Sequence, residues 1–219
     1  PYLQPENLVE SFMSKTVFDI LSKTVFDIFI IVAYGKIIPE KIINLPKLGS
    51  INIHYSLLPK YRGASPVESA ILNGDTETGV VIQKMAYKMD TGPILAMEKV
   101  EIKNDEKARD LRKRLIKIGG ELLVKTLPDF INGKTKETAQ DESQATYCKK
   151  IKKEDGLVDL ATEPPSMLYN KFRAYATWPK IFFFKNNKRI IITDALLEDD
   201  QFIIKKVLPE GKKEIKWEK

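Results

Sequence analysis

Residues 50–63 read S-I-N-I-H-Y-S-L-L-P-K-Y-R-G and contain the only histidine of the chain. The stretch S-I-N-I-H predicts a short β-strand, and because strand side chains alternate between faces, Asn52 and His54 point the same way. Histidine has an unperturbed pKa near neutrality, which makes it the usual proton carrier in enzymes. A lone histidine on a strand is also often structural, so the role of His54 has to be inferred from the residues around it.

The segments around this strand predict an α/β unit. Residues 27–34, D-I-F-I-I-V-A-Y, form a β-branched apolar run typical of a parallel strand that is covered on both faces. Residues 37–46 indicate a short helix between two prolines. The motif S-P-V-E at 65–68 indicates a helix start with a serine cap and a capping box, and this helix should end at Asn73-Gly74.

Two further strands and one long helix complete the first unit. Residues 78–85 and 93–102 predict a strand pair that is joined by the loop 86–92. Residues 105–131 carry apolar residues at helical spacing and predict the longest helix, with a weak point at Gly119-Gly120. The fold class expected for residues 1–131 is therefore α/β, with a Rossmann-like parallel or mixed sheet.

Beyond residue 131 the pattern changes. Residues 132–144 are polar and predict a linker. Residues 145–219 contain one short helical pattern and several short strands with a hairpin signal at Asn186-Asn187, which predicts a small β-barrel domain. Residues 149–219 carry 16 Lys or Arg against 11 Asp or Glu, so most of the net charge of +6 lies there. Such a surface suits a polyanion such as RNA, although a solvated lysine-rich surface gives the same count.

Composition excludes several protein classes. The apolar fraction of 43% and the charged fraction of 30% are those of a globular protein, and no apolar run approaches the length of a membrane span. The first residues lack the layout of a signal peptide, so we expect a cytoplasmic protein of a bacterium, or one of an organellar matrix. One cysteine and one histidine argue against a disulfide framework and against a bound metal. We expect a monomer.

A short motif, S-K-T-V-F-D-I, occurs twice, at 14–20 and at 22–28. Two copies are too few for a solenoid. We expect the first copy to end a helix and the second to enter the strand at 27–34.

Three polar residues form a candidate catalytic set: Asn52, His54, and Asp90 in the loop K-M-D-T-G-P. An amide can stabilise an oxyanion, an imidazole can relay a proton, and a carboxylate can orient the imidazole and raise its pKa. Ser56 is the only nearby nucleophile, and no second base exists to activate it, which favours direct transfer between bound substrates. From the residues alone, a structural His54 and an Asx turn at Asp90 stay open.

The stretch N-I-H-Y-S-L-L-P-K-Y-R-G-A-S-P-V, with G-D-T-E-T-G-V and M-D-T-G-P-I-L, resembles the folate-dependent formyltransferases. The resemblance implies that Asn52, His54 and Asp90 are catalytic, with Ser-Leu-Leu-Pro as the signature. The motifs R-G-A-S-P-V, A-T-Y-C-K-K-I-K-K-E-D-G, F-R-A-Y and V-L-P-E-G-K-K resemble the branch of the family that formylates methionyl initiator tRNA. That branch implies 10-formyltetrahydrofolate as formyl donor, no metal, and a basic barrel of oligonucleotide-binding type that holds the tRNA.

The resemblance also implies roles for further residues. Asn52 and a protonated His54 would stabilise the oxyanion that forms when the methionyl amine attacks the formyl carbon, while Asp90 orients the imidazole. The folate-pocket candidates are Tyr34, Gly35, Ile37, Ser56, Leu57, Leu58, Pro59, Ala86, Tyr87 and Asp90. The candidates for contact with tRNA or for substrate positioning are Arg62, Lys149, Lys150, Lys152 and Lys153.

The chain departs from the family at its N-terminal end, and two alternative functions stay open. The family begins with strands that precede those of this chain, so we expect an N-terminally incomplete sheet, and either an incomplete enzyme or one whose remaining portion is supplied separately. A sugar or nucleotide-sugar N-formyltransferase would share the Asn-His-Asp set without needing a basic barrel. A non-catalytic RNA-binding remnant would keep the barrel without the chemistry.

Overall fold

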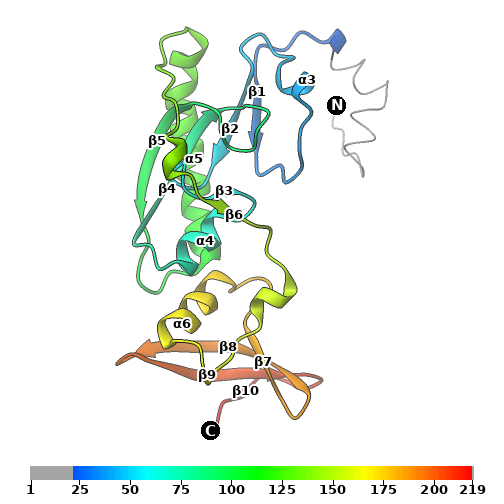
Figure 1. The fold of residues 1–219 in the computed structure, drawn as a ribbon, viewed down its shortest axis with the longest axis vertical. Helices are drawn as coiled ribbons and strands as arrows, with labels where there is room; N and C mark the ends of the chain where they lie inside the picture. The colour runs from blue at the N-terminus through cyan, green and yellow to red at the C-terminus, as the bar shows by residue number, and fades with distance from the viewer. Residues whose placement is uncertain (1–21, 219) are drawn as a thin grey trace.

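The computed structural model describes residues 22–218 and arranges them as two packed units (Figure 1). The first unit contains a four-stranded sheet in the order β1-β2-β4-β5, and the second contains a four-stranded sheet in the order β10-β9-β8-β7. The first copy of the repeated motif, at 14–20, lies outside the described residues. No helix among residues 22–218 is long and apolar enough to cross a membrane.

The sheet of the first unit is mixed. Strand β1 pairs in parallel with β2, while β4 runs antiparallel to both β2 and β5. Since Val32 pairs with Ile53, the carboxyl ends of the two parallel strands meet at one edge of the sheet. The elements of this sheet are β1 (Phe29–Val32), β2 (Ser50–His54), β4 (Glu77–Lys84) and β5 (Ile94–Glu101), with α3 (Glu40–Ile43) between the first two.

Strand β1 differs from the expectation that it is covered on both faces. Ile30 is 43% exposed and Val32 is 46% exposed, whereas Phe29 and Ile31 are partly covered. Within residues 22–218, β1 is the edge strand of its sheet, so only one of its edges is paired. The apolar run therefore predicts the strand correctly. The prediction that both of its faces are buried does not hold for residues 22–218.

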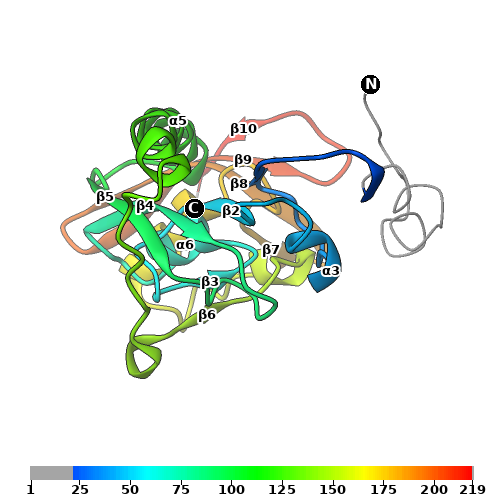
Figure 2. The same ribbon diagram turned by 90° about the horizontal axis from the view of Figure 1, so that it is seen from above.

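The long helix α5 (Ala108–Ile131) lies over one face of the sheet, as Figure 2 shows. The helix is continuous through Gly119-Gly120, where the sequence predicts a weak point. Gly119 faces the sheet, where an added Cβ would come within 3.0 Å of the Ile53 side chain and 3.2 Å of Val80. The glycine therefore permits close approach of the helix to Ile53 of β2 and Val80 of β4.

The helix α4 (Pro66–Leu72) begins and ends as predicted, but its capping box is not formed. The Ser65 hydroxyl donates to the carbonyl of Lys149 instead of capping the helix. Glu68 accepts a hydrogen bond from Arg112 of α5 at 2.5 Å. Both side chains thus bond to residues of other segments, and a local sequence motif does not predict such long-range contacts.

The second unit places a helix on an antiparallel sheet. A hairpin turns at Asn186-Asn187, where both residues have positive φ, as the sequence predicts. Leu157 adds a parallel bridge to Phe182 at the sheet's edge. The α/β class followed by a β domain is confirmed. The elements are α6 (Pro165–Ala174), β7 (Phe182–Lys185), β8 (Lys188–Glu198), β9 (Gln201–Pro209) and β10 (Ile215–Lys216).

Short elements join the two units. A two-stranded parallel pair links β3 (Arg62–Gly63) to β6 (Tyr147–Cys148), so the connecting segment returns to the first unit before the second begins. The units also contact directly, since the Tyr169 hydroxyl donates to Asp105 at 2.8 Å. The remaining short turns are the 3-10 turns η1 (Glu142–Gln144) and η2 (Lys153–Gly156).

Candidate active site

Strand β2 delivers Asn52 and His54 to one face of the sheet, opposite Gln83 and Val81 of β4. His54 is 5% exposed, whereas Asn52 is only partly buried. Within residues 22–218 the Asn52 amide has no hydrogen-bond partner. The strand therefore presents a buried imidazole next to an amide that is free to donate to a ligand.

The loop between β4 and β5 brings Asp90 to this pair. Its Oδ1 atom lies 3.7 Å from Nδ1 of His54 and accepts a hydrogen bond from the amide of Gln83 at 2.9 Å. Its Oδ2 atom accepts from the backbone N–H of Gly63 at 2.8 Å. These bonds lead away from the loop itself, so the carboxylate does not form an Asx turn, and the three predicted catalytic residues lie together.

The surroundings of His54 favour its neutral imidazole form. Its Nε2 atom lies 3.0 Å from the carbonyl oxygen of Tyr61, so Nε2 carries the hydrogen and donates it. Burial lowers the pKa of His54, and this effect exceeds the opposing influences of the Asp90 charge and the Tyr61 carbonyl. Asp90 thus raises the pKa of His54, as the sequence predicts, but burial, which the sequence reasoning did not include, lowers this pKa by more.

Two glycines make the approach of Asp90 possible. A Cβ at Gly92 would lie 1.7 Å from the carbonyl oxygen of Lys84, so only glycine lets the loop close against β4. Gly63 has φ +123°, and a Cβ there would lie 2.2 Å from the carbonyl oxygen of Cys148. Each glycine thus secures one side of the carboxylate's position.

The Ser-Leu-Leu-Pro signature forms a buried turn beside His54. The Ser56 hydroxyl is fully buried and donates to the carbonyl of Lys60 at 2.5 Å. Leu57 packs over Gly79 of β4, and the Leu58-Pro59 peptide is cis. The turn presents the carbonyl that receives the hydrogen of His54, and the engaged Ser56 hydroxyl agrees with a reaction that needs no nucleophile of the protein.

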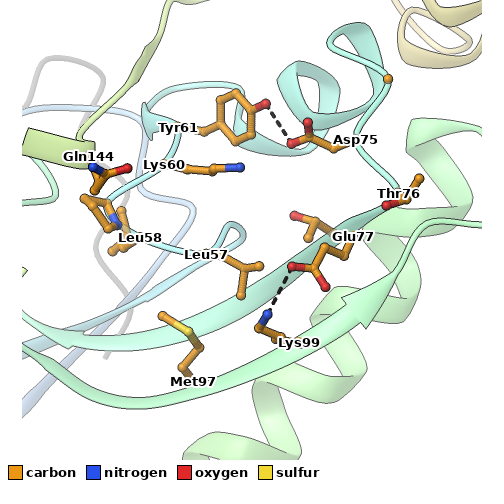
Figure 3. Close-up of a pocket in the computed structure, with 13 residues that line it drawn as sticks. Leu57, Leu58, Lys60, Tyr61, Asp75, Thr76, Glu77, Met97, Lys99 and Gln144 are labelled. Atoms are coloured by element: carbon orange, nitrogen blue, oxygen red, sulfur yellow. Dashed lines mark hydrogen bonds and ion pairs between the residues drawn. The ribbon is translucent and has the colours of Figure 1, made fainter. Parts of the chain in front are cut away.

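A cavity of about 540 Å³ opens beside this turn (Figure 3). Leu57, Leu58 and Pro59 line it, but Asn52, His54 and Asp90 do not, so it is not the cavity of the catalytic set. Two pairs of its polar side chains interact: the Tyr61 hydroxyl donates to Asp75 at 2.8 Å, and Lys99 forms an ion pair with Glu77 at 3.1 Å.

The other folate-pocket candidates lie on two loops. Tyr34, Gly35 and Ile37 follow β1, whose end adjoins that of β2 at the His54 edge of the sheet. Ala86 and Tyr87 belong to the loop that carries Asp90. Ile37 and Tyr87 are exposed, and within residues 22–218 the buried hydroxyl of Tyr34 has no hydrogen-bond partner. These side chains are available to a ligand that reaches His54 from the open edge.

Arg62 lies inside the protein rather than on its surface, with 0% of its side chain exposed. Its guanidinium forms two hydrogen bonds with the Glu142 carboxylate, at 2.7 and 2.9 Å. It donates two more to Oε1 of Gln140, at 2.8 and 3.1 Å. Gln140 and Glu142 were missed by the sequence reasoning, because a polar run such as Q-D-E-S is typical of a linker. Gln83 was missed because it was counted only as part of the strand at 78–85.

The lysine candidates are all exposed. Lys149 and Lys150 follow β6, while Lys152 and Lys153 lie at the start of η2. The segment that carries them therefore presents four cations next to the parallel pair that contains Arg62.

An amide, a neutral imidazole and a carboxylate at one edge of a mixed sheet suit proton transfer and oxyanion stabilisation during group transfer. Residues 5–127 match the family described as Formyl transferase, and residues 150–209 match the family described as Formyl transferase, C-terminal domain. The chain belongs to the formyl transferase family.

Within that family, the chain is similar to methionyl-tRNA formyltransferases. It is 39% identical to that of Dictyoglomus turgidum over 92% of this chain and 63% of the relative, and 31% identical to that of Staphylococcus epidermidis over 99% of this chain and 76% of the relative. The chain spans about 60% of the length of several such relatives.

A solved structure shares the fold. The sugar 3N-formyl transferase WlaRD, solved in the presence of dTDP and 5-N-formyl-THF, superposes with a TM-score of 0.65. The match covers 84% of this chain and 73% of that chain, with 24% sequence identity.

Proposed function

We propose that the chain transfers the formyl group of 10-formyltetrahydrofolate to the α-amine of methionyl initiator tRNA. The observation that carries the proposal is the approach of Asp90 to the buried His54 beside the open amide of Asn52. The relatives of similar sequence support this acceptor, because they are methionyl-tRNA formyltransferases. The sugar formyltransferase is similar in fold.

In the proposed reaction, the methionyl amine attacks the formyl carbon and a new N–C bond forms. The resulting oxyanion takes a hydrogen bond from the Asn52 amide. A neutral His54 can accept the proton that the amine loses, at Nδ1, since its Nε2 already carries a hydrogen toward Tyr61. The Asp90 carboxylate stabilises the imidazolium that then exists. The bond between the formyl carbon and the folate nitrogen breaks, and tetrahydrofolate leaves with a proton.

We assign the formyl donor to the exposed end of the sheet, at the carboxyl ends of β1 and β2. Tyr34, Gly35 and Ile37 border that end on one side, and Ala86 and Tyr87 border the catalytic loop. The exposed aromatic ring of Tyr87 and the exposed Ile37 suit a flat pteridine ring. The presence of a formyl-folate with WlaRD supports a folate in this fold.

We assign the tRNA to the second unit and the segment before it. Residues 149–219 hold five of the six net positive charges, and Lys149, Lys150, Lys152 and Lys153 are exposed. Clustered exposed lysines bind a phosphate backbone without reading its sequence. We also infer that the protein is a monomer. The proposed activity places it in the bacterial cytoplasm or an organellar matrix, where initiator tRNA is used.

The acceptor is tested by competition. The chain is incubated with 10-formyltetrahydrofolate that carries a labelled formyl group, together with methionyl initiator tRNA and a dTDP-linked amino sugar in equal amounts. The proposal expects label on the tRNA, and expects this label to fall as salt rises. Label on the amino sugar supports the sugar-formylating alternative, and tRNA binding without transfer supports a non-catalytic RNA-binding protein.

A further inference from the structure

The segment that joins the two units also contacts the catalytic loop. Thr138 forms two backbone hydrogen bonds with Ile94, the first residue of β5, at 2.8 and 2.9 Å. Two residues further on, Gln140 directs its side chain toward the loop that carries Asp90. Its Nε2 atom donates to the carbonyl of Asp90 at 2.8 Å and to the carbonyl of Gly92 at 2.7 Å.

The orientation of this amide is determined by its neighbours. Oε1 of Gln140 accepts two hydrogen bonds from the buried Arg62, which can only donate. The opposite end of the amide must therefore donate, and its two hydrogens meet two carbonyl oxygens that can only accept. Glu142 in turn holds the Arg62 guanidinium through a bidentate pair. Each polar group in the series has a partner of the opposite kind.

Asp90 needs such support. It has φ +55°, a left-handed conformation that costs free energy in a residue other than glycine. Tyr87 and Met89 of the same loop are exposed, so packing holds that part of the loop weakly. Gln83 and Gly63 hold the carboxylate, while Gln140 holds the backbone on both sides of Thr91.

We propose that Gln140 is a positioning residue, whose amide holds the backbone of the Asp90 loop so that the carboxylate stays beside His54. The catalytic loop of the first unit then depends on the docking of the segment between the units. The kinetic part of this inference rests on the proposed formyl transfer, whereas its structural part does not.

The structural test uses the only histidine of the chain. The imidazole of His54 gives one set of NMR signals, so its pKa can be measured without assignment against other histidines. The charge of Asp90 raises the pKa of His54. In Gln140→Met, which keeps the side-chain length and removes both ends of the amide, we expect this pKa to fall toward the value in Asp90→Asn. A matched control is Gln144→Met, since Gln144 lies in the same segment with an exposed side chain.

The kinetic test compares the same variants. Because displacement of a catalytic group by about 1 Å can cost about 10²-fold in rate, Gln140→Met should lower kcat by about 10- to 100-fold with little change in KM. Gln144→Met should keep both. If Gln140→Met does not fold, Gln140→Asn replaces it, because the shorter amide cannot reach the same partners. The His54 pKa and kcat should again fall.

The outcomes separate the two proposals. An unchanged His54 pKa in a folded Gln140→Met, or in Gln140→Asn if only that variant folds, overturns the positioning role. Absence of formyl transfer by the unsubstituted chain overturns the proposed function, and the NMR comparison still decides the role of Gln140.

Discussion

The Nδ1 atom of His54 lies 3.7 Å from Oδ1 of Asp90, beyond hydrogen-bond length and within range of a strong charge interaction. The remaining ring nitrogen already donates to the Tyr61 carbonyl. A proton that arrives at Nδ1 therefore meets a carboxylate, and the burial that disfavours the imidazolium is partly offset. This relationship makes His54 a base in the proposed reaction and leads to the predictions below.

Replacement of His54 should remove catalysis and spare binding. In His54→Asn the proton acceptor is lost while a polar side chain of smaller size remains, so kcat should fall by about 10²- to 10⁴-fold. Binding of 5-formyltetrahydrofolate, measured by calorimetry, should change little. A variant with near-full kcat would remove His54 from the chemistry.

Stability should decrease in mild acid because of His54. Burial lowers the folded-state pKa of His54 below its ordinary value of 6.5, so the unfolded chain binds the proton more readily. The contribution of His54 to stability is therefore complete above pH 6.5 and is lost as the pH falls toward the folded-state pKa. The difference can reach at most about 1.4 kcal/mol per pH unit.

Urea midpoints of the chain and of His54→Asn, measured between pH 7.5 and pH 5, check this prediction. Carboxylates contribute to the pH dependence of both proteins and cancel in the comparison. The unsubstituted chain should lose more stability than the variant over this range. Parallel pH profiles would contradict the burial argument.

Replacement of Gly92 by alanine should reduce activity, whereas the same replacement of Gly120 should not. In Gly92→Ala the new Cβ would collide with the carbonyl of Lys84, so the loop must move and Asp90 with it. Since small displacements of catalytic groups are costly, kcat should fall by about 10²-fold. Gly120→Ala is the matched control, because Gly120 is exposed in α5 with open space around its Cα.

Gly120→Ala should keep full activity and gain about 0.5–1 kcal/mol in the free energy of unfolding, since alanine is the better helix former. Steady-state kinetics and thermal unfolding of the two variants give both readouts. Equal activity of both would mean that the Gly92 contact does not hold Asp90.

The exposed lysines between the units should contribute to RNA affinity through charge alone. If Lys150 and Lys153 each neutralise one phosphate, each change to Ala should reduce the slope of log K against log salt by about 0.7 to 0.9. Lys99, which pairs with Glu77 on β4, supplies a control for loss of positive charge elsewhere. Filter binding of methionyl initiator tRNA at several salt concentrations measures these slopes, and equal slopes for all the variants would place the tRNA elsewhere.

Much of the fold could be predicted from local patterns. The helix α4 ends at Asn73-Gly74, and the hairpin turns at Asn186-Asn187, because those residues adopt the required conformations at low cost. The exposure of Ile30 and Val32 could not be predicted, because burial depends on which elements lie beside a strand. Ser65 and Glu68 match a capping box and instead bond across elements.

The candidate site was predictable in its residues and not in its electrostatics. Asn52 and His54 share a face because of strand alternation, Asp90 stood out in its glycine-containing loop, and a resemblance to a known family implied a catalytic role for all three. The protonation of His54 depends on burial from all sides, which one sequence does not display. The amide of Gln140, which bonds the Asp90 backbone, and the Glu142 partner of Arg62 lie in a segment whose composition resembles a linker.

The most direct test of the account is the pKa of His54, followed by NMR through the ring signals of this single histidine. Burial with a nearby carboxylate predicts a pKa below 6.5 in the unsubstituted chain, and a still lower value in Asp90→Asn, where the stabilising charge is gone. A value at or above 6.5, or one that Asp90→Asn leaves unchanged, would contradict the assignment of a neutral His54 supported by Asp90.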